Sequence, residues 1–118
     1  MAATDDKPAV DASVLDAACE GDQDLLEELV QLYLADTPIQ LSAARDAIRN
    51  GDADELRITA FGMKISAATV GADPLAELCL RLYRDARRGD LEKAPSLLAA
   101  CCAEFERVKD ALSRPPAR

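Results

Sequence analysis

Apolar residues recur every three or four positions along most of the chain, which is the spacing of one face of an α-helix. This pattern predicts a short helix over residues 11–19 and four longer helices over 23–49, 53–70, 74–88 and 91–112. β-Branched residues are sparse and nowhere alternate with polar ones, so we expect no strands. The core-facing positions of the four long helices are Leu26, Val30, Tyr33, Thr37, Leu41, Ala44 and Ile48; Leu56, Ala60, Met63, Ala67 and Val70; Leu75, Leu78, Leu82 and Ala86; and Leu91, Ala94, Leu98, Cys101, Phe105, Val108 and Leu112.

Glycine and aspartate mark the breaks between the predicted helices. A glycine can end one helix in the left-handed conformation, and an aspartate after it can cap the next. Pro38 falls inside the second helix, which should kink there or open by one turn. The four predicted breaks are Gly21-Asp22, Gly51-Asp52, Gly71-Ala72-Asp73-Pro74 and Gly89-Asp90.

Short links between four long amphipathic helices predict an all-α fold, an antiparallel up-down-up-down four-helix bundle. The helix over 11–19 is too short to span this bundle and is expected to form a lid at one end. A chain of 118 residues allows a single domain. We expect the bundle to occupy residues 10–112, between flexible tails at 1–9 and 113–118.

The helix over 53–70 carries a second apolar stripe opposite its core-facing side. At about 100° per residue, the core-facing side chains point within about 40° of one direction, whereas Phe61 and Ile65 point roughly 140–180° away. A neighbouring helix could cover this stripe, but a contiguous exposed patch marks a binding site more often, and we favour that interpretation. The residues beside the stripe are Ile58, Ala68, Arg57 and Lys64.

The charge balance and the absence of histidine exclude several functions. With 22 acidic and 14 basic residues, the net charge is −8, and only four residues are aromatic. We therefore expect no nucleic-acid partner, which would need a basic face and stacking platforms. No histidine is present, so the commonest general base and the usual zinc nitrogen ligand are missing. The one basic cluster, typical of an exposed helix edge, is Arg81, Arg84, Arg87 and Arg88.

The cysteines indicate neither a disulfide framework nor a metal site. Cys19, Cys79, Cys101 and Cys102 contain no Cys-x-x-Cys pair and stand among alanine and leucine, so we expect small buried thiols in a reducing compartment. No motif for a metal, a nucleotide or another cofactor is found. The chain has no signal peptide and no apolar run near 18 residues, which predicts a cytoplasmic protein without a membrane role.

One segment resembles a known family. Residues 59–72, Thr-Ala-Phe-Gly-Met-Lys-Ile-Ser-Ala-Ala-Thr-Val-Gly-Ala, are similar to the signature helix of histidine-containing phosphotransfer (HPt) domains, roughly Ala-His-x-Leu-Lys-Gly-Ser-x-x-x-Leu-Gly-Ala. The likeness extends over about 10–112 in matching order. It implies the same four-helix bundle and a role in bacterial two-component phosphorelays. Further matching segments are Asp36-Thr37-Pro38, Leu75-x-x-Leu78-Cys79-x-x-Leu82 and Glu104-Phe105-x-x-Val108.

Two departures from the family fall at its reactive position. Phe61 stands where the family has its phosphoryl-accepting histidine, and Ile65 where a glycine lets a receiver domain approach. The resemblance places Lys64 at a retained docking lysine, Tyr83 at a polar residue that supports the histidine, and Arg87 at a basic residue one turn on. Phenylalanine has no lone pair for a phosphoryl group, so we expect no phosphotransfer and no catalytic residue.

These residues favour a degenerate, non-catalytic HPt module, a pseudo-HPt. It would bind a response-regulator receiver domain or a histidine kinase and modulate a phosphorelay without carrying phosphate. One alternative is an active phosphotransfer protein whose natural histidine has been substituted; another is a structural bundle whose apolar face closes a homodimer. We expect a monomer, with the homodimer left open. The expected partner-binding residues are Phe61, Ile65, Lys64, Arg57, Ile58, Ala68, Tyr83, Arg84 and Arg87.

Overall fold

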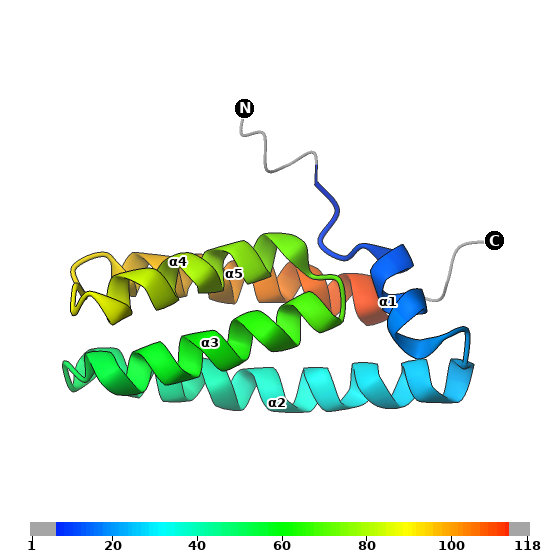
Figure 1. Cartoon of the computed structure of the whole chain (residues 1–118), viewed down its shortest axis with the longest axis horizontal. Coiled ribbons are helices and arrows are strands. Elements are labelled where there is room, and N and C mark those ends of the chain that lie inside the picture. Colours follow the sequence, from blue (N-terminus) through cyan, green and yellow to red (C-terminus); the bar gives the residue numbers. More distant parts are fainter. Residues whose placement is uncertain (1–6, 114–118) are drawn as a thin grey trace.

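The structure is a computed structural model that describes residues 7–113, and over these residues it is entirely helical apart from turns (Figure 1). The long helices begin and end close to the predicted boundaries. Residues 1–6 and 114–118, which make up most of the two predicted tails, lie outside the described residues. The five helices are α1 (Ala12–Cys19), α2 (Gln23–Arg49), α3 (Ala53–Thr69), α4 (Asp73–Arg87) and α5 (Ala94–Ser113).

Aspartate caps two of the long helices as the sequence predicts. The Asp22 carboxylate accepts a hydrogen bond from the backbone N–H of Leu25 at 3.1 Å, and Asp52 accepts from Glu55 at 3.0 Å. Each bond satisfies one of the N–H groups left without a partner at a helix start, which contributes about 1 kcal/mol. The glycines before them, like Gly71 and Gly89, have positive φ angles, as expected of residues that end helices.

The other two predicted caps are wrong in detail. At α4, Ala72 holds the N-cap position and Asp73 is the first helical residue. At α5, the helix begins at Ala94 rather than at residue 91, because the Asp90 carboxylate accepts from the N–H of Glu92 and holds residues 91–93 in a turn. Pro95 then follows in the first turn of α5, where its missing N–H costs nothing.

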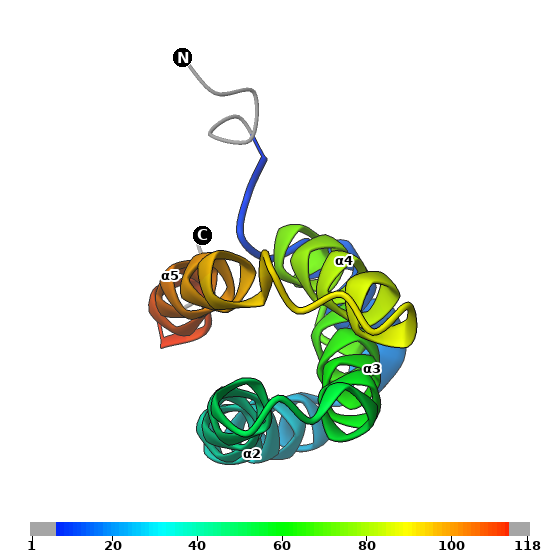
Figure 2. The same ribbon diagram turned by 90° about the vertical axis from the view of Figure 1, so that its left-hand side faces the viewer.

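The four long helices form a closed ring of contacts. In Figure 1 they lie side by side along the long axis, and in Figure 2, seen end-on, α3 stands between α2 and α4 with α5 beside α4. Helix α2 packs on α3, α3 on α4 and α4 on α5, while α5 also contacts α2. The short helix α1 contacts α2 and α3 at one end of the ring, consistent with a lid.

The ring encloses one hydrophobic core, and nearly every predicted core position lies in it. All five predicted core residues of α3 are buried, and Ala60 and Ala67 are fully inaccessible. Five predicted positions are only partly buried against this core: Leu26, Ile48, Leu78, Leu91 and Leu112. Tyr33 packs edge-on against Phe105, with ring centroids 6.0 Å apart, and burial raises the pKa of the Tyr33 phenol to about 12.

Pro38 does not interrupt α2. The sequence predicted a kink or an open turn at this residue, but α2 is helical without a break from Gln23 to Arg49. Proline removes one backbone donor, but the buried residues Thr37 and Leu41 anchor the helix on both sides of it. The Thr37 hydroxyl also donates a 2.8 Å hydrogen bond to the Tyr33 carbonyl, one turn back.

Residues just before α1 pack on the bundle. Ala9 is buried, the Lys7 ammonium pairs with Glu77 of α4 at 3.4 Å, and Arg107 of α5 donates to the Lys7 carbonyl. The N–H of Asp11 donates to the Gly71 carbonyl at 2.8 Å, which ties the start of α1 to the turn between α3 and α4.

Gly71 has both a positive φ angle and a close backbone neighbour, so two separate reasons require a glycine there. Its φ is +77°, and a Cβ there would lie 2.5 Å from the Asp11 carbonyl oxygen, whereas Gly51 has φ +66° with open space around it. We expect Gly51→Ala to lower the free energy of unfolding by about 1 kcal/mol through backbone strain alone. Gly71→Ala should cost at least about 2–3 kcal/mol, because the Asp11 contact is also lost. Urea denaturation of the two variants measures both, and equal losses would contradict the close approach.

Candidate functional site

An aromatic pair lies at the centre of the outer surface shared by α3 and α4. Phe61 projects from the middle of α3 and Tyr83 from α4, with ring centroids 5.4 Å apart and ring planes inclined by 43°. Such a tilted pair stabilises its own arrangement by about 0.5–1.5 kcal/mol and gives the surface a rigid centre. The two residues that the family resemblance connected are therefore in contact in the structure.

The second stripe of α3 is exposed, as the preferred interpretation predicted. Phe61 is 47% exposed, Ile65 48% and Ile58 56%. No helix within residues 7–113 covers them, although Tyr83 lies beside Phe61 and Ala68 is partly buried against the core. The alternative that a neighbouring helix buries Phe61 and Ile65 is wrong, because each keeps about half of its surface in solvent.

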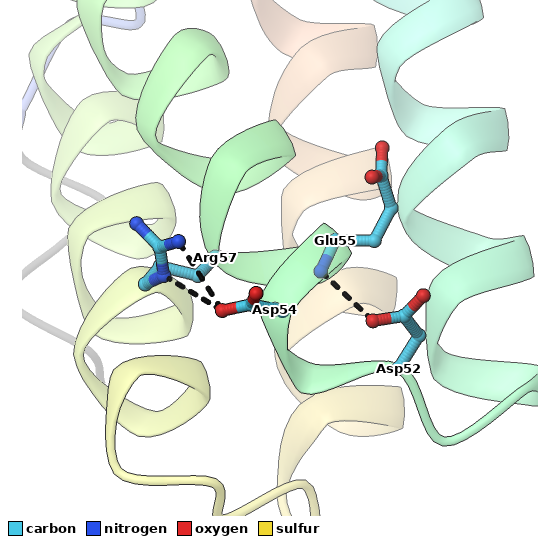
Figure 3. Close-up of polar contacts among 4 residues, drawn as sticks. All are labelled: Asp52, Asp54, Glu55 and Arg57. Carbon is cyan, nitrogen blue, oxygen red and sulfur yellow. Dashed lines mark hydrogen bonds and ion pairs between the residues drawn. The ribbon is translucent and has the colours of Figure 1, made fainter.

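Basic side chains surround this apolar surface. Lys64 and Arg57 of α3 are half-buried, whereas Arg84 and Arg87 of α4 are exposed. Among residues 7–113, Arg57 is the one member of this group in an ion pair, with Asp54 at 3.2 Å (Figure 3). None of the other three forms an ion pair with an acidic side chain of the described chain.

The start of α3 determines where these groups point. Figure 3 shows Asp52 capping the helix through the N–H of Glu55 while Asp54 holds the Arg57 guanidinium. Side chains on a rigid helix keep fixed angles to one another. Because the side of α3 that carries Ala60 faces the core, Phe61 points outward. We name the surface made by Phe61, Ile65, Ile58, Ala68, Tyr83, Lys64, Arg57, Arg84 and Arg87 the α3–α4 patch.

Sequence analysis missed a second group of exposed apolar residues, on α2. Leu25, Leu32 and Ile39 are 47%, 55% and 68% exposed. Over residues 7–113, every exposed large apolar side chain is on α2 or α3. The signal was present as a spacing of seven residues, but the core-facing series of α2 is the stronger pattern and hides it.

Position 61, at the centre of the α3–α4 patch, offers no nucleophile for a covalent reaction. Phe61 is a hydrocarbon, and the chain has no histidine. The thiols of Cys79 and Cys101 are buried in the core, where a hydrogen bond with Cys101 and burial raise the pKa of Cys79. Within residues 7–113, no cluster of histidine, cysteine or acidic side chains could hold a metal ion, and no helix is long and apolar enough to cross a membrane.

Comparisons with known proteins assign the family. The model of the Hpt domain family matches residues 28–113, so the chain belongs to the Hpt domain family. A comparison with curated protein sequences finds no match.

Two solved structures are similar along most of the chain. One is histidine-containing phosphotransfer protein B (HptB) from Pseudomonas aeruginosa PAO1, with 33% identity over 89% of this chain and 91% of that one, and a TM-score of 0.85. The other is the HPT domain of the Hpt sensor hybrid histidine kinase from Shewanella, with 14% identity over 88% and 90% of the two chains and a TM-score of 0.75. The second supports the fold alone. The family match and the first of these structures relate this chain to the Hpt domains of two-component phosphorelays.

The two phenylalanines make a matched test of exposure. Phe61→Ala should cost no more than about 1.5 kcal/mol, because the ring is half in solvent and loses mainly its contact with Tyr83. Phe105→Ala removes a buried ring and should cost about 3–5 kcal/mol. Chemical denaturation of both variants measures the difference, and a loss at Phe61 as large as at Phe105 would show that Phe61 supports the core.

Proposed function

We propose that this protein is a pseudo-HPt: it binds a receiver domain or a histidine kinase and modulates a phosphorelay without carrying a phosphoryl group. The observation that carries the proposal is the half-exposed phenylalanine at the position of the family's acceptor histidine. An aromatic group within a basic rim is a good anchor for a protein interface, but it cannot form a phosphoramidate bond.

The α3–α4 patch fits such a partner in both polarity and charge. A receiver domain has an acidic pocket surrounded by apolar residues. Phe61 and Ile65 supply the apolar contact, and Lys64, Arg84 and Arg87 supply unpaired positive charge around it. Complementary charge accelerates association and selects the partner. The aromatic ring of Phe61, once it is buried in the interface, contributes most of the affinity. The helical domain of a histidine kinase is the other partner that we propose.

Both alternatives from the sequence differ from this proposal in testable ways. An active phosphotransfer protein with a substituted histidine would need only one change, whereas this chain also has Ile65 where the family has glycine. A homodimer through the α3–α4 patch would bring the basic groups Lys64, Arg84 and Arg87 of two copies together, which costs energy. We therefore infer a monomer. We also propose that the protein is cytoplasmic and that its helices run in antiparallel up-down-up-down order.

The binding test uses purified receiver domains and kinase helical domains from the two-component proteins of the source organism. We expect one of them to bind the natural chain and Phe61→Asp to weaken that binding at least about 30-fold, the loss of a hot-spot residue. Isothermal titration calorimetry measures the affinities. Ala99→Asp, which adds the same charge on α5, is the control and should bind like the natural chain. If neither class of domain binds, or if Phe61→Asp binds unchanged, the proposal fails.

Phosphotransfer itself gives an independent test. The natural chain should take no label from a radiolabelled kinase or phospho-receiver, because no imidazole is present. Phe61→His alone should be labelled poorly, since Ile65 keeps the donor away, whereas the double variant Phe61→His/Ile65→Gly should be labelled at least ten times faster. Acid lability of the label identifies phosphohistidine. Labelling of the natural chain would show that phosphate is carried elsewhere.

A further inference from the structure

A cavity of about 290 Å³ lies between α2 and α5, and neither α3 nor α4 contributes to its wall. In Figure 2, α2 and α5 stand on one side of the ring of helices, and α3 and α4 stand on the other. The cavity is therefore separate from the α3–α4 patch, and we name it the α2–α5 cavity. Its lining residues are Arg45 and Ile48 of α2 and Pro95, Leu98, Ala99 and Cys102 of α5.

The wall of the α2–α5 cavity is mostly apolar. Ile48 and Leu98 contribute aliphatic side chains, and Cys102 contributes a thiol, which is a weak hydrogen-bonding group. An apolar wall with a few polar groups is the usual composition of a site for a small organic ligand. An apolar cavity of about 150 Å³ accommodates benzene, so this larger one has room for roughly ten non-hydrogen atoms.

Arg45 is the one charged side chain in this wall, and it has no carboxylate partner. Its guanidinium donates a single, long hydrogen bond, from Nη2 to the Cys102 sulfur at 3.8 Å. Sulfur is a weak acceptor, and no acidic side chain within residues 7–113 forms an ion pair with Arg45. A planar guanidinium binds a carboxylate through two parallel hydrogen bonds, so Arg45 is free to accept such a ligand group.

We propose that the α2–α5 cavity binds a small amphipathic carboxylate, an organic acid with an apolar body of about eight carbon atoms, and that Arg45 pairs with its carboxylate group. The apolar body displaces water from Ile48 and Leu98, which is favourable. The carboxylate replaces the weak thiol contact of the guanidinium with a charge-assisted pair. This site goes beyond the proposed role of Phe61 and does not depend on it.

A protein partner is disfavoured as the occupant of this cavity. Over residues 7–113, the exposed large apolar side chains all lie on α2 or α3, and none of them lines the cavity. The surface around it therefore lacks the contiguous apolar patch that marks a protein interface. A small ligand needs only the cavity itself and the one charged group in its wall.

The direct test follows the backbone amide signals of the full chain by NMR during titration with octanoate. Octanamide has the same size as octanoate but no charge, and acetate has the charge without the apolar body. We expect octanoate to shift the signals of Arg45, Ile48, Leu98, Ala99 and Cys102, and octanamide and acetate to bind at least ten times more weakly. Absence of these shifts with octanoate, or equal binding of octanamide, would overturn the proposal.

A matched pair of variants separates a specific contact from general attraction to positive charge. Arg45→Gln and Arg49→Gln each remove one charge from an exposed position of α2, but Arg49 pairs with Asp46 at 3.2 Å and does not line the cavity. We expect Arg45→Gln to weaken octanoate binding at least tenfold and Arg49→Gln less than twofold, with unchanged helicity. Equal weakening in both variants would show non-specific attraction and overturn the proposal.

Cys102 reports independently on whether the cavity is occupied. It is the one cysteine of the four that is not buried, so iodoacetamide reacts with it first. Saturating octanoate should slow the alkylation of Cys102 at least fivefold, whereas octanamide at the same concentration should leave the rate unchanged. Mass spectrometry of the digested chain locates the label. An alkylation rate that octanoate does not change would overturn the proposal.

The α2–α5 cavity and the α3–α4 patch can fail independently. The patch also joins apolar and basic side chains, so octanoate shifts confined to Phe61, Ile65 and Tyr83 would assign the carboxylate to the patch and overturn the proposal. Phe61→Asp should leave octanoate binding unchanged, because Phe61 does not line the cavity. Ala99→Asp places a carboxylate in the cavity wall, so it should weaken octanoate binding at least tenfold; unchanged binding in this variant would contradict the site.

Discussion

The rotation of α3 about its own axis is the constraint on which the rest of the arrangement depends. Leu56, Ala60 and Ala67 are fully buried between the other helices, so α3 cannot rotate without exposing them and opening cavities. Side chains on a rigid helix keep fixed angles to one another. Burial of this stripe therefore places Phe61 and Ile65 in solvent, whatever those two residues contribute to stability.

That constraint separates the stability of the bundle from the chemistry of its surface. The core needs Ala60 and Met63 in their positions, but position 61 tolerates many side chains, because the ring there is half in solvent and packs mainly on Tyr83. In the proposed correspondence, the family has a histidine and this chain a phenylalanine at this position of the same scaffold. The fold alone therefore does not define the function, and our proposal assigns it to the group at this position and the charges around it.

The same scaffold distributes charge unevenly. Helix α2 is acidic along its first half, whereas Lys64 of α3 and the arginines of α4 provide the unpaired positive charge of the α3–α4 patch. Since α3 stands between α2 and α4, its apolar residues border an acidic edge on one side and a basic edge on the other (Figure 2).

The sequence by itself determined the helices, the core and the outward direction of Phe61, because all three follow from local periodicity and from the conformational preferences of glycine and aspartate. It misplaced the start of α5, where the side chain of Asp90 competes for the backbone, and it did not reveal the α2–α5 cavity. The contact of Phe61 with Tyr83, the tie between Asp11 and Gly71, and the contact of Arg45 with Cys102 were decided only by the tertiary structure. Each of these joins residues on different helices, and their distance depends on how whole helices pack, which no local pattern contains.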